Sequence, residues 1–389
     1  RTPLPKPDVR SMLRPLGPVV VFGASNFPLA FSVAGGDTAS ALAAGNPVIV
    51  KAHHAHPGTS ELVGLAVSRA VRQCDLHEGV FSLIYGSGSE VGTALVKHPL
   101  IKAGGFTGSR SGGRALFDAA SSRPEPIPFY AEMSSVNPVF ILPGAVKVRG
   151  EEIATGLHAS VTLGAGQFCT NPGLVFMSAR PETDKFIEKL GALLVATPEQ
   201  TMLTPGIRSG YETGVLGRGG SASTVFQKSA ETSCGVSPAL FRTDARGYLA
   251  NSTLSEEIFG PTTLIVTYAN QEELFELLRS LEGQLTATVH GTEEELTGNR
   301  ELIDILQTKA GRLLFNGFPT GVEVCHAMVH GGPYPATSDG RSTSVGTRAI
   351  FRFTRQVCYQ GFPDTALPDE LKEENPLHIC RLVDGTLVQ

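Results

Sequence analysis

Short apolar runs alternate with longer amphipathic stretches along the first third of the chain. Val19–Phe22 is wholly apolar, and the stretch 28–44 that follows has a helical pattern, with Pro28 suited to a first turn and Gly45 to a stop. Strands that alternate with helices predict an α/β fold, a parallel sheet wound on both faces, with ligands beyond the carboxyl ends of its strands. Further strands are predicted at 47–50, 80–85, 103–107 and 127–131, and further helices at 59–71, 90–96 and 112–120.

The pattern changes after Glu132 and predicts a second α/β domain. Residues 204–260 are rich in Gly, Ser and Thr, and we expect them to be irregular. The tail alternates at Phe351, Phe353 and Val357, which predicts an edge strand that pairs with another element or subunit. The predicted strands are 139–142, 173–177, 264–266, 287–289 and 313–315, and the helices 151–161, 182–194, 272–278 and 301–306. The predicted domains are 1–18 (an extended linker or oligomerisation segment), 19–132, 133–345, and 346–389 (a C-terminal return segment and oligomerisation strand).

Composition narrows the class of protein. The 389 residues carry 32 basic and 37 acidic side chains without a basic stripe, which argues against nucleic acid as the main partner. No apolar run approaches the ~20 residues that a membrane span needs. The six cysteines form no C-x-x-C pair, which indicates reduced thiols and favours a cytoplasmic location.

The segment Gly164-Ala165-Gly166-Gln167-Phe168-Cys169-Thr170 places one cysteine among small residues, where a substrate can approach the backbone closely. Our hypothesis is that Cys169 is a covalent nucleophile. Its thiol would attack an aldehyde to give a thiohemiacetal, hydride loss would leave a thioester, and water would cleave it. A free cysteine is more often simply buried, so this interpretation depends on the rest of the chain.

Two residues at strand ends could assist such a thiol. Asn26 follows the first strand, and its amide can polarise a carbonyl, although a helix cap is the likelier use of an Asn there. Glu132 ends the fifth strand, where its carboxylate can face the cleft and act as a general base on water; the alternative is a surface glutamate.

Other strand ends could hold a dinucleotide. Lys51 ends the second strand, where a ribose would lie, and Phe106-Thr107-Gly108-Ser109 forms a turn into a helix that suits a pyrophosphate. Glu256-Glu257-Ile258-Phe259 offers a carboxylate for a ribose diol and a ring for packing. A solvated lysine, a capped turn and a helix end are the respective alternatives.

Metal chemistry is not predicted. His53, His54 and His56 cluster, but no Cys or His set lies at the spacing of a zinc site. Gly331-Gly332-Pro333 lacks the ending of a phosphate-binding P-loop.

Taken in order, Asn26, Lys51, F-T-G-S, Glu132, G-Q-x-C and E-E-I-F-G-P resemble the NAD(P)-dependent aldehyde dehydrogenase superfamily. The resemblance runs from Gly17-Pro18 to about residue 360. It implies a Rossmann-type cofactor domain, a catalytic domain, a small oligomerisation element, a homo-oligomer (dimer or tetramer) and a small-molecule aldehyde as substrate. By matching position, the resemblance implies three catalytic roles: Cys169 as nucleophile, Glu132 as base, and Asn26 with the Cys169 N–H as oxyanion hole. It also implies that Lys51 contacts the cofactor ribose and Gly108-Ser109 the pyrophosphate. Glu257 and Phe259 would contact the nicotinamide side of the cofactor.

Two later phrases, 315–324 and 327–335, resemble the 2,5-dioxovalerate (α-ketoglutarate semialdehyde) dehydrogenase branch. That resemblance implies oxidation of 2,5-dioxopentanoate. The bacterial NADP-dependent fatty aldehyde dehydrogenases are similar there, so a medium-chain or fatty aldehyde is the alternative. NAD-preferring relatives often have a Glu three residues after the strand-end lysine. His54 occupies that position, which predicts that NADP is used, either in preference to NAD or alongside it.

The sequence departs from the family in two places. The usual E-L-G-G-K reads Glu132-Met133-Ser134-Ser135-Val136, and a longer segment normally precedes Gly17. We therefore expect a fragment, less soluble than its full-length form. Two rival functions remain: a CoA-acylating dehydrogenase, disfavoured because that branch generally lacks the base at Glu132, and a truncated relative that binds dinucleotide without turnover.

Overall fold

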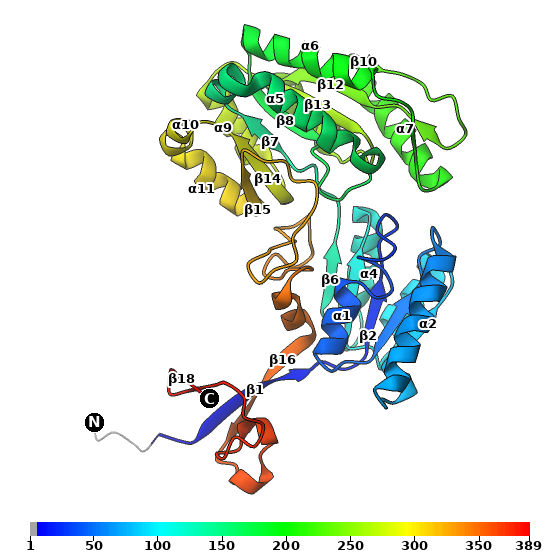
Figure 1. Cartoon of the computed structure of the whole chain (residues 1–389), viewed down its shortest axis with the longest axis vertical. Coiled ribbons are helices and arrows are strands. Elements are labelled where there is room, and N and C mark those ends of the chain that lie inside the picture. The colour runs from blue at the N-terminus through cyan, green and yellow to red at the C-terminus, as the bar shows by residue number, and fades with distance from the viewer. Residues whose placement is uncertain (1–5) are drawn as a thin grey trace.

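The computed structural model of the protein describes residues 6–389, arranged as two lobes and a projecting arm (Figure 1). The N-terminal lobe contains a five-stranded sheet, and the other lobe contains a seven-stranded sheet. Among residues 6–389, no helix combines the length and apolar character that crossing a membrane requires.

The sheet of the N-terminal lobe is parallel throughout, in the order β4-β3-β2-β5-β6. Phe22 is in register with both Lys51 and Phe106, and Thr107 is in register with Glu132. The carboxyl ends of four strands therefore meet at one edge, as the alternating pattern predicted. The strands are β2 (Val19–Phe22), β3 (Val48–Lys51), β4 (Phe81–Ile84), β5 (Ala103–Thr107) and β6 (Phe129–Glu132).

The predicted helix 28–44 is wrong in its first half. The chain turns after β2, with Ala24 N donating to Phe31 O and Phe31 N donating to Phe27 O, and α1 begins only at Gly36. A side chain on Gly35 would collide with the Phe31 and Ser32 backbone at 2.8 Å, so the turn needs a glycine there. The lobe's helices are α1 (Gly36–Ala43), α2 (Pro57–Gln73), α3 (Thr93–Lys97) and α4 (Arg110–Ser121).

The second sheet has the order β10-β12-β13-β8-β7-β14-β15 and is parallel except for β10 at its edge. Its main strands are β7 (Val139–Ile141), β8 (Leu174–Ser178), β10 (Ser223–Gln227), β12 (Ala239–Asp244), β13 (Thr262–Tyr268), β14 (Gln284–His290) and β15 (Ala310–Phe315). Its helices are α5 (Pro143–Thr162), α6 (Pro181–Val195), α7 (Pro205–Gly219), α8 (Ala245–Ala250), α9 (Gln271–Ser280), α10 (Glu293–Gly298) and α11 (Arg300–Lys309). The short strands β9 (Gln200–Thr201) and β11 (Gly235–Val236) pair beside this sheet.

The prediction that 204–260 is irregular is wrong, because the segment contains α7, β10, β12 and α8. Its many Gly and Ser residues weaken intrinsic helix propensity, but packing of a few large side chains overrides that preference. Tyr211 and Val215 of α7 are buried, and Phe241 of β12 is wholly buried.

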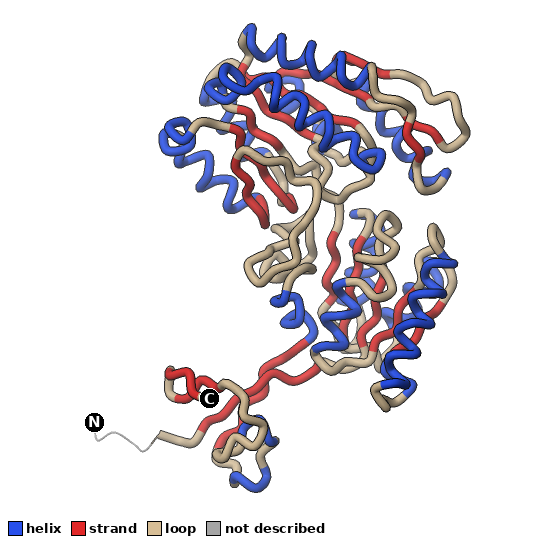
Figure 2. Tube along the Cα trace, in the orientation of Figure 1, coloured by secondary structure: helices blue, strands red, loops and turns tan. Residues whose placement is uncertain are grey.

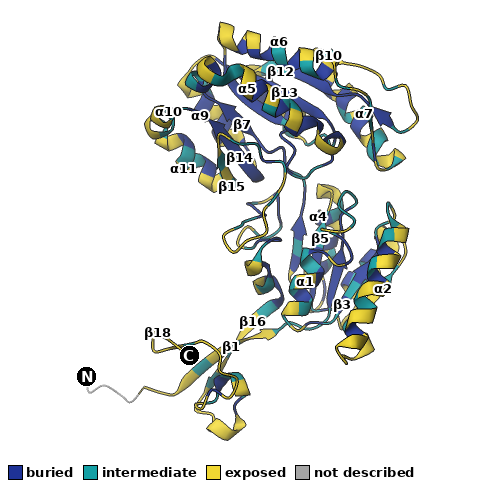
Figure 3. Cartoon of the chain, in the orientation of Figure 1, coloured by how far each residue is buried: buried dark blue, intermediate teal, exposed yellow. Residues whose placement is uncertain are grey.

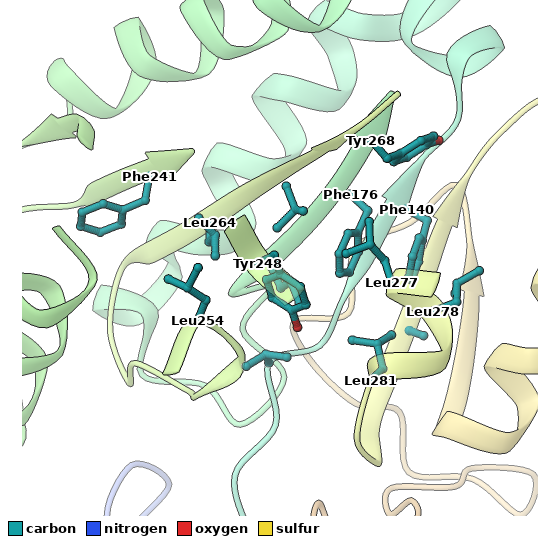
Figure 4. Packing of buried hydrophobic residues seen from close by; sticks show 14 of the residues in the cluster. Phe140, Phe176, Phe241, Tyr248, Leu254, Leu264, Tyr268, Leu277, Leu278 and Leu281 are labelled. Carbon is teal, nitrogen blue, oxygen red and sulfur yellow. The ribbon is translucent and has the colours of Figure 1, made fainter. Parts of the chain in front are cut away.

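The strands of the second sheet consist largely of buried residues (Figure 3). Their apolar side chains belong to two separate clusters, one that contains Phe140 and Phe176 and one that contains Val139 and Val175. Phe140 and Phe176 stack with ring centroids 4.8 Å apart, and Tyr248 meets Phe176 edge-on (Figure 4). Burial of each such side chain contributes about 1.5–3 kcal/mol, so the strands that carry the loop around Cys169 are firmly held.

The arm is a two-stranded antiparallel ribbon of β1 (Val9–Pro15) and β16 (Thr354–Gln360) (Figure 2). This pairing agrees with the predicted extended start and with the predicted edge strand, although Phe351 and Phe353 belong to the 3₁₀ helix Thr347–Phe353 instead. The predicted extended segment 1–18 also includes residues 1–5, which lie outside the described residues. A small hairpin of β17 (Arg381–Val383) and β18 (Thr386–Val388) follows near the C-terminus.

Candidate active site

Three side chains from distant parts of the chain meet between the lobes. The Cys169 Sγ lies 3.5 Å from His330 Nε2, and the same nitrogen lies 3.0 Å from Glu132 Oε1. The donor atoms of the three side chains all lie within 4.8 Å of one another. A thiol, an imidazole and a carboxylate are thereby brought into mutual contact.

Local backbone geometry exposes Cys169 at the end of a tight loop. Gly164, Ala165 and Gly166 all have positive φ (58°, 58° and 65°), a region that glycine enters readily. A side chain on Gly166 would lie 2.2 Å from the Gly260 carbonyl carbon, so the loop packs backbone to backbone against that residue. Asn137 Nδ2 donates to the Cys169 carbonyl at 2.9 Å and fixes the loop from the other side.

Glu132 ends β6 and is almost completely buried. Its Oε2 accepts a hydrogen bond of 2.6 Å from the Ser344 hydroxyl, while its Oε1 faces His330. His330 is 2 % exposed, and the ring of Phe31 stacks over it at 6.1 Å. Each carboxylate oxygen thus has one fixed partner.

The charges of this group are coupled. Burial alone raises the pKa of Glu132, but the neighbouring His330 outweighs it with help from Ser344 and Arg352, so the pKa of Glu132 lies below its ordinary value. Burial disfavours the charged form of His330, yet Glu132 raises the pKa of this imidazole well above its ordinary value. Burial raises the pKa of Cys169, and His330 only partly opposes that effect. The resting state is therefore a neutral thiol beside an imidazolium–carboxylate pair.

The predicted oxyanion donor lies at the same place. Asn26 follows β2, and its Nδ2 donates to the Gln167 carbonyl at 2.8 Å. Gln167 is two residues from Cys169, so the structure brings Asn26 to the cysteine loop. Phe27 and Phe168 pack edge-on at 5.1 Å and hold the two segments together.

A pocket of about 440 Å³ opens onto Cys169 and His330. Aromatic and aliphatic side chains supply much of its wall, including Phe27, Phe31, Val322 and Val324. A pocket of this size and polarity suits a small organic substrate held with its reactive end at the thiol.

The predicted dinucleotide contacts gather at the carboxyl edge of the N-terminal sheet. Lys51 ends β3, Gly108 follows β5, and Ser109 caps α4 by accepting from Gly112 N. Lys51 is 7 % exposed, and burial lowers its pKa, with no carboxylate among residues 6–389 to offset that effect. His54 is exposed and stacks on His53 at 4.4 Å. This edge offers an amine and a helix N-terminus to an anionic ligand.

Glu257 and Phe259 lie beside the cysteine loop. They line a small hollow together with Gly166, Phe168 and Ser135. Burial raises the pKa of Glu257 to about 7, despite hydrogen bonds from Ser134 and Ser135 N. These two residues are therefore close to the cysteine loop, whereas Lys51 and Ser109 lie at the edge of the N-terminal sheet.

Sequence reasoning missed His330, which the structure places at the centre of the group. The residue was visible in the phrase Met328-Val329-His330-Gly331-Gly332, but a lone histidine in an apolar stretch carries no spacing motif. A contact between residues 161 positions apart cannot be deduced from local pattern.

The fold combines two α/β lobes with parallel sheets, and a cysteine, a histidine and a glutamate meet beside a pocket. The sequence model of the aldehyde dehydrogenase family matches residues 3–344, and the chain belongs to that family. The predicted family and fold are therefore confirmed, and with them an enzyme that oxidises small aldehydes.

Similar proteins agree with this assignment. The chain is 55 % identical to α-ketoglutaric semialdehyde dehydrogenase 2 of Azospirillum brasilense, covering 99 % of this chain and 74 % of the relative. It is 50 % identical to α-ketoglutaric semialdehyde dehydrogenase of Acinetobacter baylyi, covering 100 % and 74 %. Among solved structures, 1-pyrroline-5-carboxylate dehydrogenase from Thermus with bound NAD has a TM-score of 0.77 at 22 % identity, covering 92 % of this chain and 69 % of that one. Glyceraldehyde-3-phosphate dehydrogenase from Methanocaldococcus jannaschii, complexed with NADP, has a TM-score of 0.76 at 18 % identity, covering 92 % and 76 %.

Proposed function

We propose that this enzyme oxidises 2,5-dioxopentanoate to 2-oxoglutarate with NADP or NAD, using Cys169 as nucleophile and Glu132 as general base. The observation that carries the proposal is the contact of Cys169, His330 and Glu132 beside an apolar pocket that Cys169 and His330 line. The names of the two relatives at 55 % and 50 % identity support the substrate.

The chemistry begins with the Cys169 thiol, which is neutral at rest. Attack on the aldehyde carbon requires loss of the thiol proton, and the Glu132–His330 pair is the adjacent group able to take it. The Asn26 amide and the Cys169 N–H would stabilise the developing oxyanion. A bound nicotinamide supplies the hydride acceptor. The proton taken from the thiol must then leave to solvent. Glu132, ionised again because His330 lowers its pKa, takes a proton from the water that cleaves the thioester.

His330 holds the base in place. It donates to Glu132 Oε1 while Ser344 donates to Oε2, so the carboxylate has little rotational freedom. Because the same Nε2 lies 3.5 Å from Cys169, His330 links the base to the nucleophile. We propose that it is a positioning residue for both.

The chain's residues fit a dinucleotide. The Lys51 amine is buried without an ionic partner among the described residues, and Ser109 begins a helix of 12 residues whose N-terminus favours phosphate. A side chain on Gly108 would meet the ring of Phe106 at 2.8 Å, so the turn keeps its backbone open. His54 places no carboxylate near the expected ribose, which favours NADP use.

The distal carboxylate of the semialdehyde needs a cation, and we propose Arg312. Its guanidinium donates to the carbonyls of Pro319 and Gly321, and Gly321 lines the pocket. Its Nε is buried without a hydrogen-bond partner among residues 6–389, and Arg312 is close enough to Cys169 for their charges to interact. Salt bridges to Arg312 are absent from the described part of the chain, so this charge is available to an anion.

We also propose a cytoplasmic homo-oligomer, a dimer or tetramer. The six cysteines are all free, as expected in a reducing compartment. A two-stranded ribbon such as β1–β16 is marginally stable alone, and it exposes Val9 and Leu13, so a second subunit would stabilise it.

Turnover measured by absorbance of reduced nicotinamide tests the proposal. We expect 2,5-dioxopentanoate to give a higher kcat/KM than hexanal, NADP to be used at least alongside NAD, and CoA to have no effect. A much higher kcat/KM for hexanal would favour the fatty aldehyde alternative, whose support is the apolar pocket wall. Dependence on CoA would indicate an acylating enzyme, and binding of cofactor without turnover would indicate a non-catalytic relative.

A further inference from the structure

The contact between Cys169, His330 and Glu132 brings together three different metal-binding donors. A thiolate sulfur, an imidazole nitrogen and a carboxylate oxygen are the ligands that Zn²⁺ takes in proteins. We propose that these three side chains form an inhibitory site for Zn²⁺ and for chemically similar divalent cations. The inhibition rests on the proposed roles of Cys169 and Glu132, whereas the binding does not.

The observed spacing is close to what zinc requires. Zinc bonds of about 2.3 Å to sulfur and about 2.0–2.2 Å to nitrogen and oxygen, at tetrahedral angles, place the donor atoms about 3.3–3.6 Å apart. The Sγ–Nε2 separation is 3.5 Å and the Nε2–Oε1 separation is 3.0 Å. The three donor atoms lie within 4.8 Å of one another, so small side-chain rotations bring all three onto one ion.

The surroundings orient two of the ligands. Ser344 donates to Glu132 Oε2 and leaves Oε1 directed at the group, and Phe31 stacks on the His330 ring. A thiolate and a carboxylate together balance the charge of a divalent cation, with His330 neutral. Binding would release the protons that Cys169 and His330 hold in the resting enzyme.

The same geometry favours a reversible inhibitor over a resident metal. Histidines in resident sites almost always donate their second ring nitrogen to a carboxylate, carbonyl or water. His330 Nδ1 is buried and has no hydrogen-bond partner among the described residues. The fourth coordination position would face the pocket, which Cys169 and His330 both line, so a chelator can reach the ion.

Co²⁺ alone provides the test, because its thiolate charge-transfer and tetrahedral bands report binding without turnover. We expect the wild-type enzyme to bind one Co²⁺ per chain with these bands and Zn²⁺ to displace it. The Cys169→Ala variant should show no charge-transfer band. His330→Phe should weaken Co²⁺ binding and Zn²⁺ inhibition roughly tenfold or more. Loss of a residue that only hydrogen-bonds to a metal ligand typically lowers metal affinity by about that factor, and loss of the ligand itself should lower it at least as much. His290→Phe is the matched control, because His290 is also buried and lies outside the group; it should bind as the wild type does.

A second readout needs no variant. Zn²⁺ should slow alkylation of Cys169 but not of the exposed Cys325, measured by peptide mass mapping, and EDTA should restore both the alkylation rate and activity. A charge-transfer band that persists in Cys169→Ala, equal affinity in His330→Phe, or unprotected Cys169 would overturn the proposed site. Failure of the catalytic proposal is distinguishable, because it would appear as aldehyde oxidation that survives complete alkylation of Cys169.

Discussion

Replacing His330 by Phe should change the pH at which the enzyme works. The substitution keeps an aromatic ring under Phe31 but removes the nitrogen that contacts Glu132 Oε1 and Cys169 Sγ. Glu132 would keep the Ser344 hydrogen bond and the more distant charge of Arg352. Because burial is the largest influence on Glu132 and would then be mostly unopposed, its pKa should rise above the ordinary value of 4.5.

The size of the change follows from the burial of the pair. Their side chains are 2 % and 4 % exposed, and removal of one partner from a buried ion pair costs about 3–5 kcal/mol while the other stays charged. Protonation of Glu132 relieves that cost. The pKa of Glu132 should therefore rise in the variant, because its protonated form avoids that cost. A base is active only when ionised, so the acid limb of the rate profile should move to higher pH.

Steady-state kcat against pH, followed by reduced nicotinamide, measures the limb. A pre-steady-state burst at each pH separates acylation from hydrolysis of the thioester. His290→Phe serves as control and should leave the profile unchanged, and Ser344→Ala should move the limb in the same direction because it removes the other fixed partner of Glu132. An acid limb at the same pH in His330→Phe and in the wild type would refute the coupling of His330 to the base.

Four further variants test the remaining assignments. Cys169→Ala should give neither burst nor turnover yet still bind cofactor, and steady activity in this variant would overturn the mechanism. If the thiol ionises by another route, Glu132→Gln should give a burst of up to one reduced cofactor per site and then turnover slower by ~10²–10⁴-fold. Unchanged steady turnover would remove Glu132 from its role, and no burst with a thiol that resists alkylation would mean that Glu132 also activates Cys169. Glu257→Gln should stabilise the protein against urea above pH 7 and leave its stability unchanged below about pH 4.5. The folded-state pKa of Glu257 is raised to about 7, so ionisation of this side chain destabilises the fold as the pH rises from about 4.5 to 7. The gain in unfolding free energy is at most about 3 kcal/mol, and equal stability of variant and wild type at pH 8 would contradict the prediction. Arg312→Met should raise KM for the semialdehyde by about tenfold or more with hexanal little affected, since a charged hydrogen bond contributes about 1.5–3 kcal/mol; equal losses for both substrates would indicate a structural role only.

Much of the fold could be predicted because its determinants are local. Buried parallel strands such as Val19–Phe22 are continuous apolar runs, and Pro or Gly punctuates the helices between them. The prediction failed where local preference and tertiary packing disagree. In 204–260 the Gly and Ser residues favour loops, but burial of Tyr211, Val215 and Phe241 stabilises a helix and a strand. In 28–35 the pattern is helical, but the chain must turn to bring Asn26 to the cysteine loop.

The residues of the site likewise include some that local pattern predicts and one that it does not. Strand-end residues such as Lys51 and Glu132 could be identified because parallel strands bring their carboxyl ends to one edge, which local pattern reveals. His330 has no such signal, since it reaches the site on a long segment that runs between the lobes after β15. Yet its effect is local: it lowers the pKa of Glu132, which burial alone would raise. A base buried enough to exclude bulk water needs a compensating positive charge to remain ionised, and the three-dimensional structure alone identifies the residue that supplies it. In the proposed mechanism, His330 therefore favours the ionised form of Glu132 that a general base requires.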